Sequence, residues 1–148
     1  MTTIYDTPKA NLENEQAPAF SLFKLNGIVI ATFVGSAVAG GILMYINFKR
    51  LGLPDKANKS LLYSIIGFVL LMIASIFIPY ADKIPNIAFT VAQVVALLHF
   101  SKEHLGPLID SHAATGGELA SNWKAFGIGL LVLLPVVAFV FLLAFSTI

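Results

Sequence analysis

The histidines and the glutamate near residue 100 are the side chains whose types and spacing could support catalysis or metal binding. His99 and Glu103 are four residues apart and would share one face of a helix. A zinc protease needs H-E-x-x-H or its inverse, because both imidazoles must reach the metal from one face. The order here is H-x-x-x-E-H, so His99 and His104 would point in different directions. We therefore predict interfacial histidines, with no catalytic residue, no metal and no cofactor. A regulatory metal or proton site, or a membrane enzyme that uses this cluster, is the alternative.

Gln93 is the strongly polar side chain deepest in an apolar run, and Thr90 lies three residues before it. An amide in hydrocarbon needs a hydrogen-bond partner, so Gln93 should face other helices. This pattern predicts an interhelical hydrogen bond. The alternative is that both residues line the pathway of a transported solute. No ionisable residue lies in the central part of an apolar run, which argues against proton relays and ion-coupling sites.

The elements that must position these side chains are apolar segments without Asp, Glu, Lys or Arg. Four such runs cover residues 25–48, 60–81, 84–101 and 125–148. Each reaches or approaches the roughly 20 residues that a helix needs to cross a bilayer. Only 11% of the 148 residues are charged, whereas about 25% is usual in soluble domains. The sequence therefore predicts an integral membrane protein.

The predicted fold is an all-α bundle of four transmembrane helices. The spans are expected at about 23–48, 60–79, 84–100 and 125–146, after a polar, disordered tail over residues 1–22. The chain has no cysteine, which excludes disulfides and cysteine-based metal sites. Its formal net charge of +1 gives no electrostatic reason to expect binding to nucleic acid.

Small residues recur along the first predicted span. Ala31, Gly35 and Ala39 are spaced by four residues, and Ser36 and Gly40 repeat that spacing on a neighbouring face. Such a pattern lets another helix backbone approach closely. We interpret these residues as a packing surface inside the bundle, with a dimerisation surface as the alternative.

Lysine and arginine positions predict the orientation in the membrane. The first and third loops carry Lys49, Arg50, Lys56, Lys59, Lys102 and Lys124, and the opposite side carries Lys9, Lys24 and Lys83. The positive-inside rule places these two loops in the cytoplasm and both termini outside.

Three short segments resemble small bacterial inner-membrane proteins of unknown function. The opening Ile4-Tyr5-Asp6-Thr7-Pro8-Lys9-Ala10-Asn11-Leu12 looks like their Tyr-x-x-Pro-x-Ala segment. The stretches after Gly40-Gly41 and after Gly116-Gly117 are also similar, including Ser121-Asn122-Trp123-Lys124. The resemblance implies a bacterial four-helix membrane protein and no particular activity. It also implies an N-terminus on the cytoplasmic side, opposite to the orientation from the lysine and arginine positions.

These observations favour a non-enzymatic protein of the bacterial inner membrane that binds a protein partner in an accessory, assembly or immunity-type role. The expected partners are the lipid bilayer and another membrane protein or a second copy. Residues of the first and third loops would form the contact surface, namely Lys49, Arg50, Lys56, His104 and Asp110. The alternative function is a small oligomeric transporter or channel that uses Thr90 and Gln93.

Overall fold

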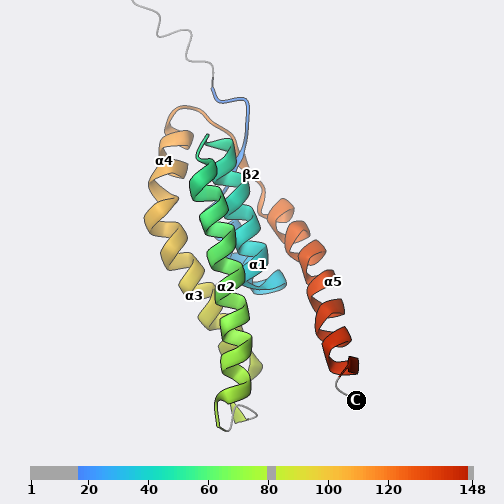
Figure 1. The fold of residues 1–148 in the computed structure, drawn as a ribbon. Coiled ribbons are helices and arrows are strands. Elements are labelled where there is room, and N and C mark those ends of the chain that lie inside the picture. The colour runs from blue at the N-terminus through green and yellow to red at the C-terminus, as the bar shows by residue number, and fades with distance from the viewer. Residues whose placement is uncertain (1–16, 80–82, 147–148) are drawn as a thin grey trace, which may run out of the picture.

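The computed structural model describes residues 17–79 and 83–146 and is built almost entirely from helices (Figure 1). Its elements, in chain order, are β1 (Leu22–Phe23), α1 (Leu25–Arg50), α2 (Pro54–Phe77), α3 (Asn86–His104), α4 (Gly106–Ala114), β2 (Leu119–Ala120) and α5 (Asn122–Ser146). The all-helical character agrees with the prediction. Residues 1–16 of the predicted tail lie outside the described residues, whereas Leu22 of that tail is fully buried.

α1 is a hairpin of two helical arms, residues 25–35 and 37–50. Ser36 between them has φ 74° and ψ 178°, which are not helical angles. A straight helix would hold the backbones of Phe23 and Asn47 about 36 Å apart. Instead, the Asn47 side chain accepts a hydrogen bond from the Phe23 N–H and donates one to the Phe23 carbonyl, both at 2.8 Å. The chain therefore reverses at Ser36, and the two ends of α1 meet.

The two arms pack closely because small residues face each other across the hairpin. Gly40 lies against Thr32, and a Cβ atom built on Gly40 would collide with the Thr32 hydroxyl. The Thr32 hydroxyl is itself satisfied, since it donates to the Ile28 carbonyl at 2.7 Å. In Figure 1, α1 accordingly occupies only the upper part of the molecule, while α2 continues well below it.

The α1 hairpin is the centre on which α2, α3 and α5 pack. Its first arm contacts α5, where Gly35 approaches the backbone carbonyl of Gly129. Its second arm contacts α2 and α3, with Gly41 against Ser64 and Gly40 also beside Leu97. Because α1 lies between them, α2 and α3 make few contacts with each other.

The base of the hairpin forms one end of the molecule together with β1, β2 and α4, and we call this the strand end. The strands pair in parallel, with Leu22 opposite Leu119 and Phe23 opposite Ala120. The largest fully buried side chains gather here, including Leu22, Leu43, Met44, Phe48 and Leu105. The Arg50 guanidinium donates to the Ser21 carbonyl, which ties the chain before α1 to its end.

The strand end corrects the predicted arrangement of the N-terminal segment. The prediction placed the chain before the first helix on the side opposite to the first and third loops. The structure instead places residues 17–24 beside the first and third loops, because α1 reverses and ends close to where it begins. The prediction was wrong because it treated α1 as a single straight helix that crosses the membrane.

A short helix follows α3 and begins with a Gly106-Pro107 pair, a combination that usually ends a helix. α3 does end at His104, but α4 starts at Gly106 with Pro107 in its first turn. Proline is well tolerated there because the first N–H groups of a helix have no intrahelical acceptor.

By length and composition, three of the described helices could each cross a membrane: α1, α2 and α5. The four spans expected from the sequence are not confirmed. α3 covers the third predicted span but is not among the three helices, since it carries Gln93, His99, Lys102 and Glu103. Moreover, the longer arm of α1 measures about 21 Å, which is shorter than the hydrocarbon core of roughly 30 Å.

Candidate functional site at the apex of the α1 hairpin

The apex of the hairpin is closed by a side chain from α3. Ala37 begins the second arm, so its N–H has no acceptor within that arm. The Gln93 Oε1 atom accepts this N–H at 2.8 Å. Gln93 thus makes an interhelical hydrogen bond across 56 positions of sequence, and it caps a helix that starts inside the apolar part of the molecule.

A groove between α2 and α3 runs over the second arm of α1 to this apex. It forms a half-open hollow of about 420 Å³. Small or apolar side chains form most of its wall, and the polar residues in it are Ser60, Tyr63, Ser64 and Gln93. None of the described residues that line it is charged. A second hollow of about 270 Å³ continues from Gln93 past Ser75 and Asn86.

Most hydroxyl groups along this groove are used by their own helix. Ser60 donates to the Ala57 carbonyl and Ser64 to the Leu61 carbonyl, each at 2.8 Å. The amide nitrogen of Gln93 differs, because no described residue accepts a hydrogen bond from it. The groove therefore presents an unused hydrogen-bond donor beside the apex.

Ser36, at the turn itself, adds an unusual backbone and an unsatisfied hydroxyl. Its φ and ψ fall in a region that is essentially restricted to glycine and that costs about 1–3 kcal/mol for other residues. Its Oγ atom is buried and has no hydrogen-bond partner among the described residues. The other predicted pathway residue, Thr90, is half-buried and does not line either hollow.

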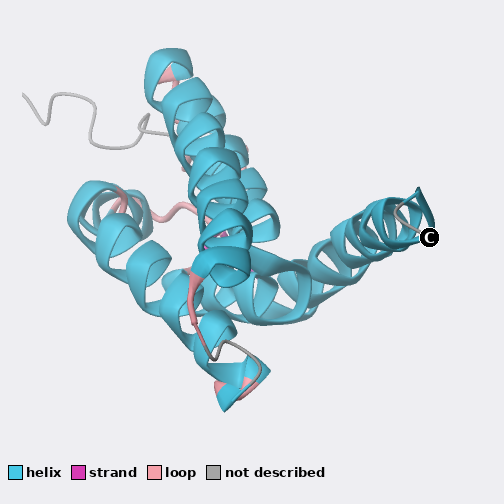
Figure 2. Cartoon of the chain, turned by 60° about the horizontal axis from the view of Figure 1, so that its bottom comes forward, coloured by secondary structure: helices cyan, strands magenta, loops and turns pink. Residues whose placement is uncertain are grey.

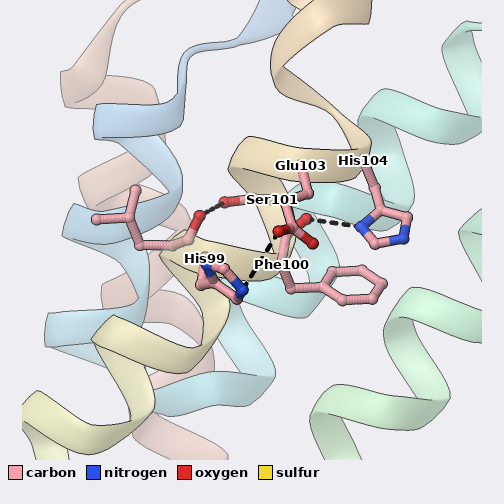
Figure 3. A network of polar contacts seen from close by, with 6 residues as sticks. His99, Phe100, Ser101, Glu103 and His104 are labelled. Carbon is pink, nitrogen blue, oxygen red and sulfur yellow. Dashed lines mark hydrogen bonds and ion pairs between the residues drawn. The ribbon is translucent and has the colours of Figure 1, made fainter.

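The side chains of the histidine cluster lie on two different faces of α3. The Nε2 atom of His99 lies 3.4 Å from Oε1 of Glu103, and the two side chains are 75% and 58% exposed. His104 lies on another face, where its ring stacks on Phe100 with 4.3 Å between centroids (Figure 3). No group of three His, Cys, Asp or Glu residues in the described ranges could hold a metal ion.

Two of the buried polar residues, Asn47 and His112, organise the strand end, and the sequence predicted a role for neither. Asn47 joins the two ends of α1, as described above. His112 is buried, its Nε2 lies 3.1 Å from the Glu118 carbonyl, and its ring stacks on Phe20 with 5.0 Å between centroids. Asn47 could have been noticed, because it is an amide inside a charge-free run as Gln93 is. His112 has no comparable signal.

The remaining predicted residues fall into two groups. The helix-packing residues all lie at or beside the hairpin, with Ala31, Gly35, Ala39 and Gly40 buried and Ser36 at the turn. The contacts described for their glycines are with other parts of the same chain. The predicted partner-contact residues are all exposed on elements at the strand end, namely Lys49, Arg50, Lys56, His104 and Asp110.

Comparisons of this chain with protein-family models, with curated proteins and with solved structures found no match. Three features of this chain bear on its function: the hairpin apex, the groove between α2 and α3, and the exposed apolar side chains of α5.

Proposed function

We propose that this chain is a non-enzymatic protein of a bacterial inner membrane that acts by binding a protein partner within the bilayer. The observation that supports the proposal most is the exposure of large apolar side chains along the second part of α5. Figures 1 and 2 show α5 leaving the other helices toward its C-terminal end. Large apolar side chains are exposed there, including Leu134, Phe139, Phe141, Leu142 and Phe145.

The short first arm of α1 explains why α5 is only partly covered. That arm, residues 25–35, is about 16 Å long, whereas α5 is about 38 Å long. Contacts such as that of Gly129 with Ala31 and Val34 therefore stay in the first half of α5. The uncovered half offers van der Waals contacts to a helix of another protein, and in membranes such packing is a main source of helix association.

The proposed topology has three crossings, by α2, α3 and α5, with α1 entering and leaving on one side. α3 is less apolar than the three helices named above, but it must cross because it brings the chain back from the far end of α2 to the strand end (Figure 1). Almost all basic residues of the described chain lie at the strand end: Lys24, Lys49, Arg50, Lys56, Lys59, Lys102 and Lys124. Only Lys83 lies toward the other end. The positive-inside rule then favours a cytoplasmic strand end and a C-terminus on the opposite side. The cytoplasmic position of residues 17–24 agrees with the resemblance described above.

The partner proposal can be tested by photo-crosslinking from α5 in cells. A photoreactive amino acid at the exposed Phe141 position should give a discrete protein adduct, and mass spectrometry should identify its second chain. The same amino acid at Ile66, which is exposed on α2, is the matched control. Adding Leu142→Ala should weaken the adduct. Adducts with lipid only, at both positions, would contradict the proposal.

A small transporter or channel is the second candidate function, and the interrupted α1 helix is the observation that favours it. Interrupted helices that end near the middle of the bilayer often form substrate sites in transporters. Here the interruption is closed by Gln93, which lies between the two hollows of the α2–α3 groove. Solute flux into liposomes should then be lost in Gln93→Leu. Equal flux with and without the protein would contradict this candidate.

A further inference from the structure

We propose that the groove between α2 and α3 binds a neutral, hydrocarbon-soluble molecule with a carbonyl acceptor, of the lipid-quinone class. The inference goes beyond partner binding by α5 and does not depend on it, but it rests on the proposed topology, which places the strand end at one membrane surface. Its basis is the combination of an uncharged cavity, an oriented hydrogen-bond donor and the depth of that donor within the fold.

The cavity has the size and lining of a site for a small apolar molecule. Its volume of about 420 Å³ lies within the range of roughly 300–1,000 Å³ that is usual for ligand pockets. Small residues such as Gly67, Ala92 and Ala96 leave this space between α2 and α3. Because no described residue that lines the groove is charged, an ionic ligand would lose its hydration there without compensation. The lining therefore selects a neutral ligand.

The Gln93 amide supplies a donor with a fixed direction. Its Oε1 atom is held by the Ala37 N–H at 2.8 Å, which leaves the Nε2 hydrogens as the free part of the group. A donor without a partner in an apolar environment is costly, and an acceptor on a bound molecule would remove that cost. The backbone carbonyls of a partner helix are already used within that helix, so they would not supply this acceptor.

The distance of Gln93 from the membrane surface further restricts the class of ligand. The second arm of α1 places its first residue, Ala37, about 20 Å from the strand end. This distance exceeds half of a hydrocarbon core that is roughly 30 Å thick. The ester carbonyls of phospholipids stay near the membrane surface with their headgroups, so they would not reach Gln93. A lipid quinone dissolves wholly in the hydrocarbon and brings a ring carbonyl to this depth.

The test uses the full chain in lipid nanodiscs and a decyl-substituted benzoquinone as the probe. Bound quinone is measured by absorbance after gel filtration, against empty nanodiscs. The expected result is saturable binding of one quinone per chain. Decylbenzene, which has the tail but no carbonyl, should not compete for the site.

Two matched glycine variants separate binding in the groove from general partitioning into lipid. Gly67 lines the groove and Gly127 lies on α5, and a Cβ atom built on either meets nothing within 4 Å. Gly67→Leu should fill the groove and weaken quinone binding at least tenfold. Gly127→Leu should bind as the original chain does, and circular dichroism checks that both variants fold.

Gln93→Met tests the hydrogen bond separately from the space. It keeps the length of the side chain but removes the donor, and loss of one hydrogen bond should weaken binding about tenfold. Because the change also removes the acceptor of the Ala37 N–H, circular dichroism must show that this variant folds as the original chain does. Equal quinone uptake by Gly67→Leu and Gly127→Leu would overturn the proposal. A dimer that Gly67→Leu dissociates, without any change in quinone uptake, would also overturn it, because a second copy would then occupy the groove.

Discussion

The reversal of α1 can be measured directly with two spin labels near its ends. The chain has no cysteine, so Lys24→Cys and Lys49→Cys provide unique attachment sites. Both lysines are exposed, and neither substitution disturbs the buried base of the hairpin. The labelled protein is reconstituted in lipid nanodiscs, and double electron–electron resonance gives the distribution of distances between the labels.

The hairpin and a straight helix predict very different distances. If α1 were straight, the backbones at positions 24 and 49 would be about 38 Å apart. In the hairpin, both positions lie at the strand end, where Asn47 bonds to Phe23. Adjacent helices pack with their axes about 8–10 Å apart, so the backbones should be separated by about 10 Å. The measured distribution should therefore be centred at about half of the straight-helix value or less, even after adding the label arms.

A second label pair on an uninterrupted helix serves as the control. Lys56→Cys and Ile76→Cys lie on α2, and both positions are exposed. Their expected backbone distance is about 30 Å, although fewer residues separate them than separate the α1 pair. A distribution near 38 Å for the α1 pair would refute the hairpin. The apex site and the proposed three-crossing topology would then fail together.

Three further predictions concern the turn, the base of the hairpin and the orientation. Ser36→Gly should raise the free energy of unfolding by about 1 kcal/mol, because glycine adopts the observed backbone angles without strain; thermal unfolding in detergent measures the change. Asn47→Ala should lower that free energy by about 2–4 kcal/mol, because it leaves the buried N–H and carbonyl of Phe23 without their partner; the same assay applies. In the single variants Lys83→Cys and Lys124→Cys, the cysteine should react with a membrane-impermeant maleimide. The two cysteines should react from opposite sides of oriented vesicles, because the proposed topology places these positions on opposite sides of the membrane.

Each of these predictions has a contrary outcome. A lower unfolding temperature for Ser36→Gly would mean that the serine hydroxyl, which has no partner among the described residues, contributes to stability in another way. No loss of stability in Asn47→Ala would show that the base of the hairpin is held by other contacts. Labelling of Lys83→Cys and Lys124→Cys from the same side would exclude the proposed orientation.

Much of the helical content of this protein follows from local sequence. α2 and α5 were expected over 60–79 and 125–146 and are found at Pro54–Phe77 and Asn122–Ser146. Charge-free runs of this length form helices because every backbone polar group must be satisfied without water. The polar side chain singled out inside such a run, Gln93, does contact another helix. Helix formation and the need of an amide in an apolar run for a hydrogen-bond partner are properties of the local sequence, so composition and spacing suffice to predict them; which residue becomes the partner is not.

The reversal of α1 at Ser36, in contrast, could not be predicted from the sequence and is determined by the tertiary structure. A straight helix and a hairpin over residues 25–50 have the same composition and the same mean hydropathy. The small residues predicted close packing, but their spacing does not say whether Gly40 meets another helix or Thr32 of the other arm. Reversal depends on the backbone angles of one residue, Ser36, and on partners distant in sequence, such as Phe23 with Asn47. Because those contacts form only when the whole chain has folded, no local pattern records them.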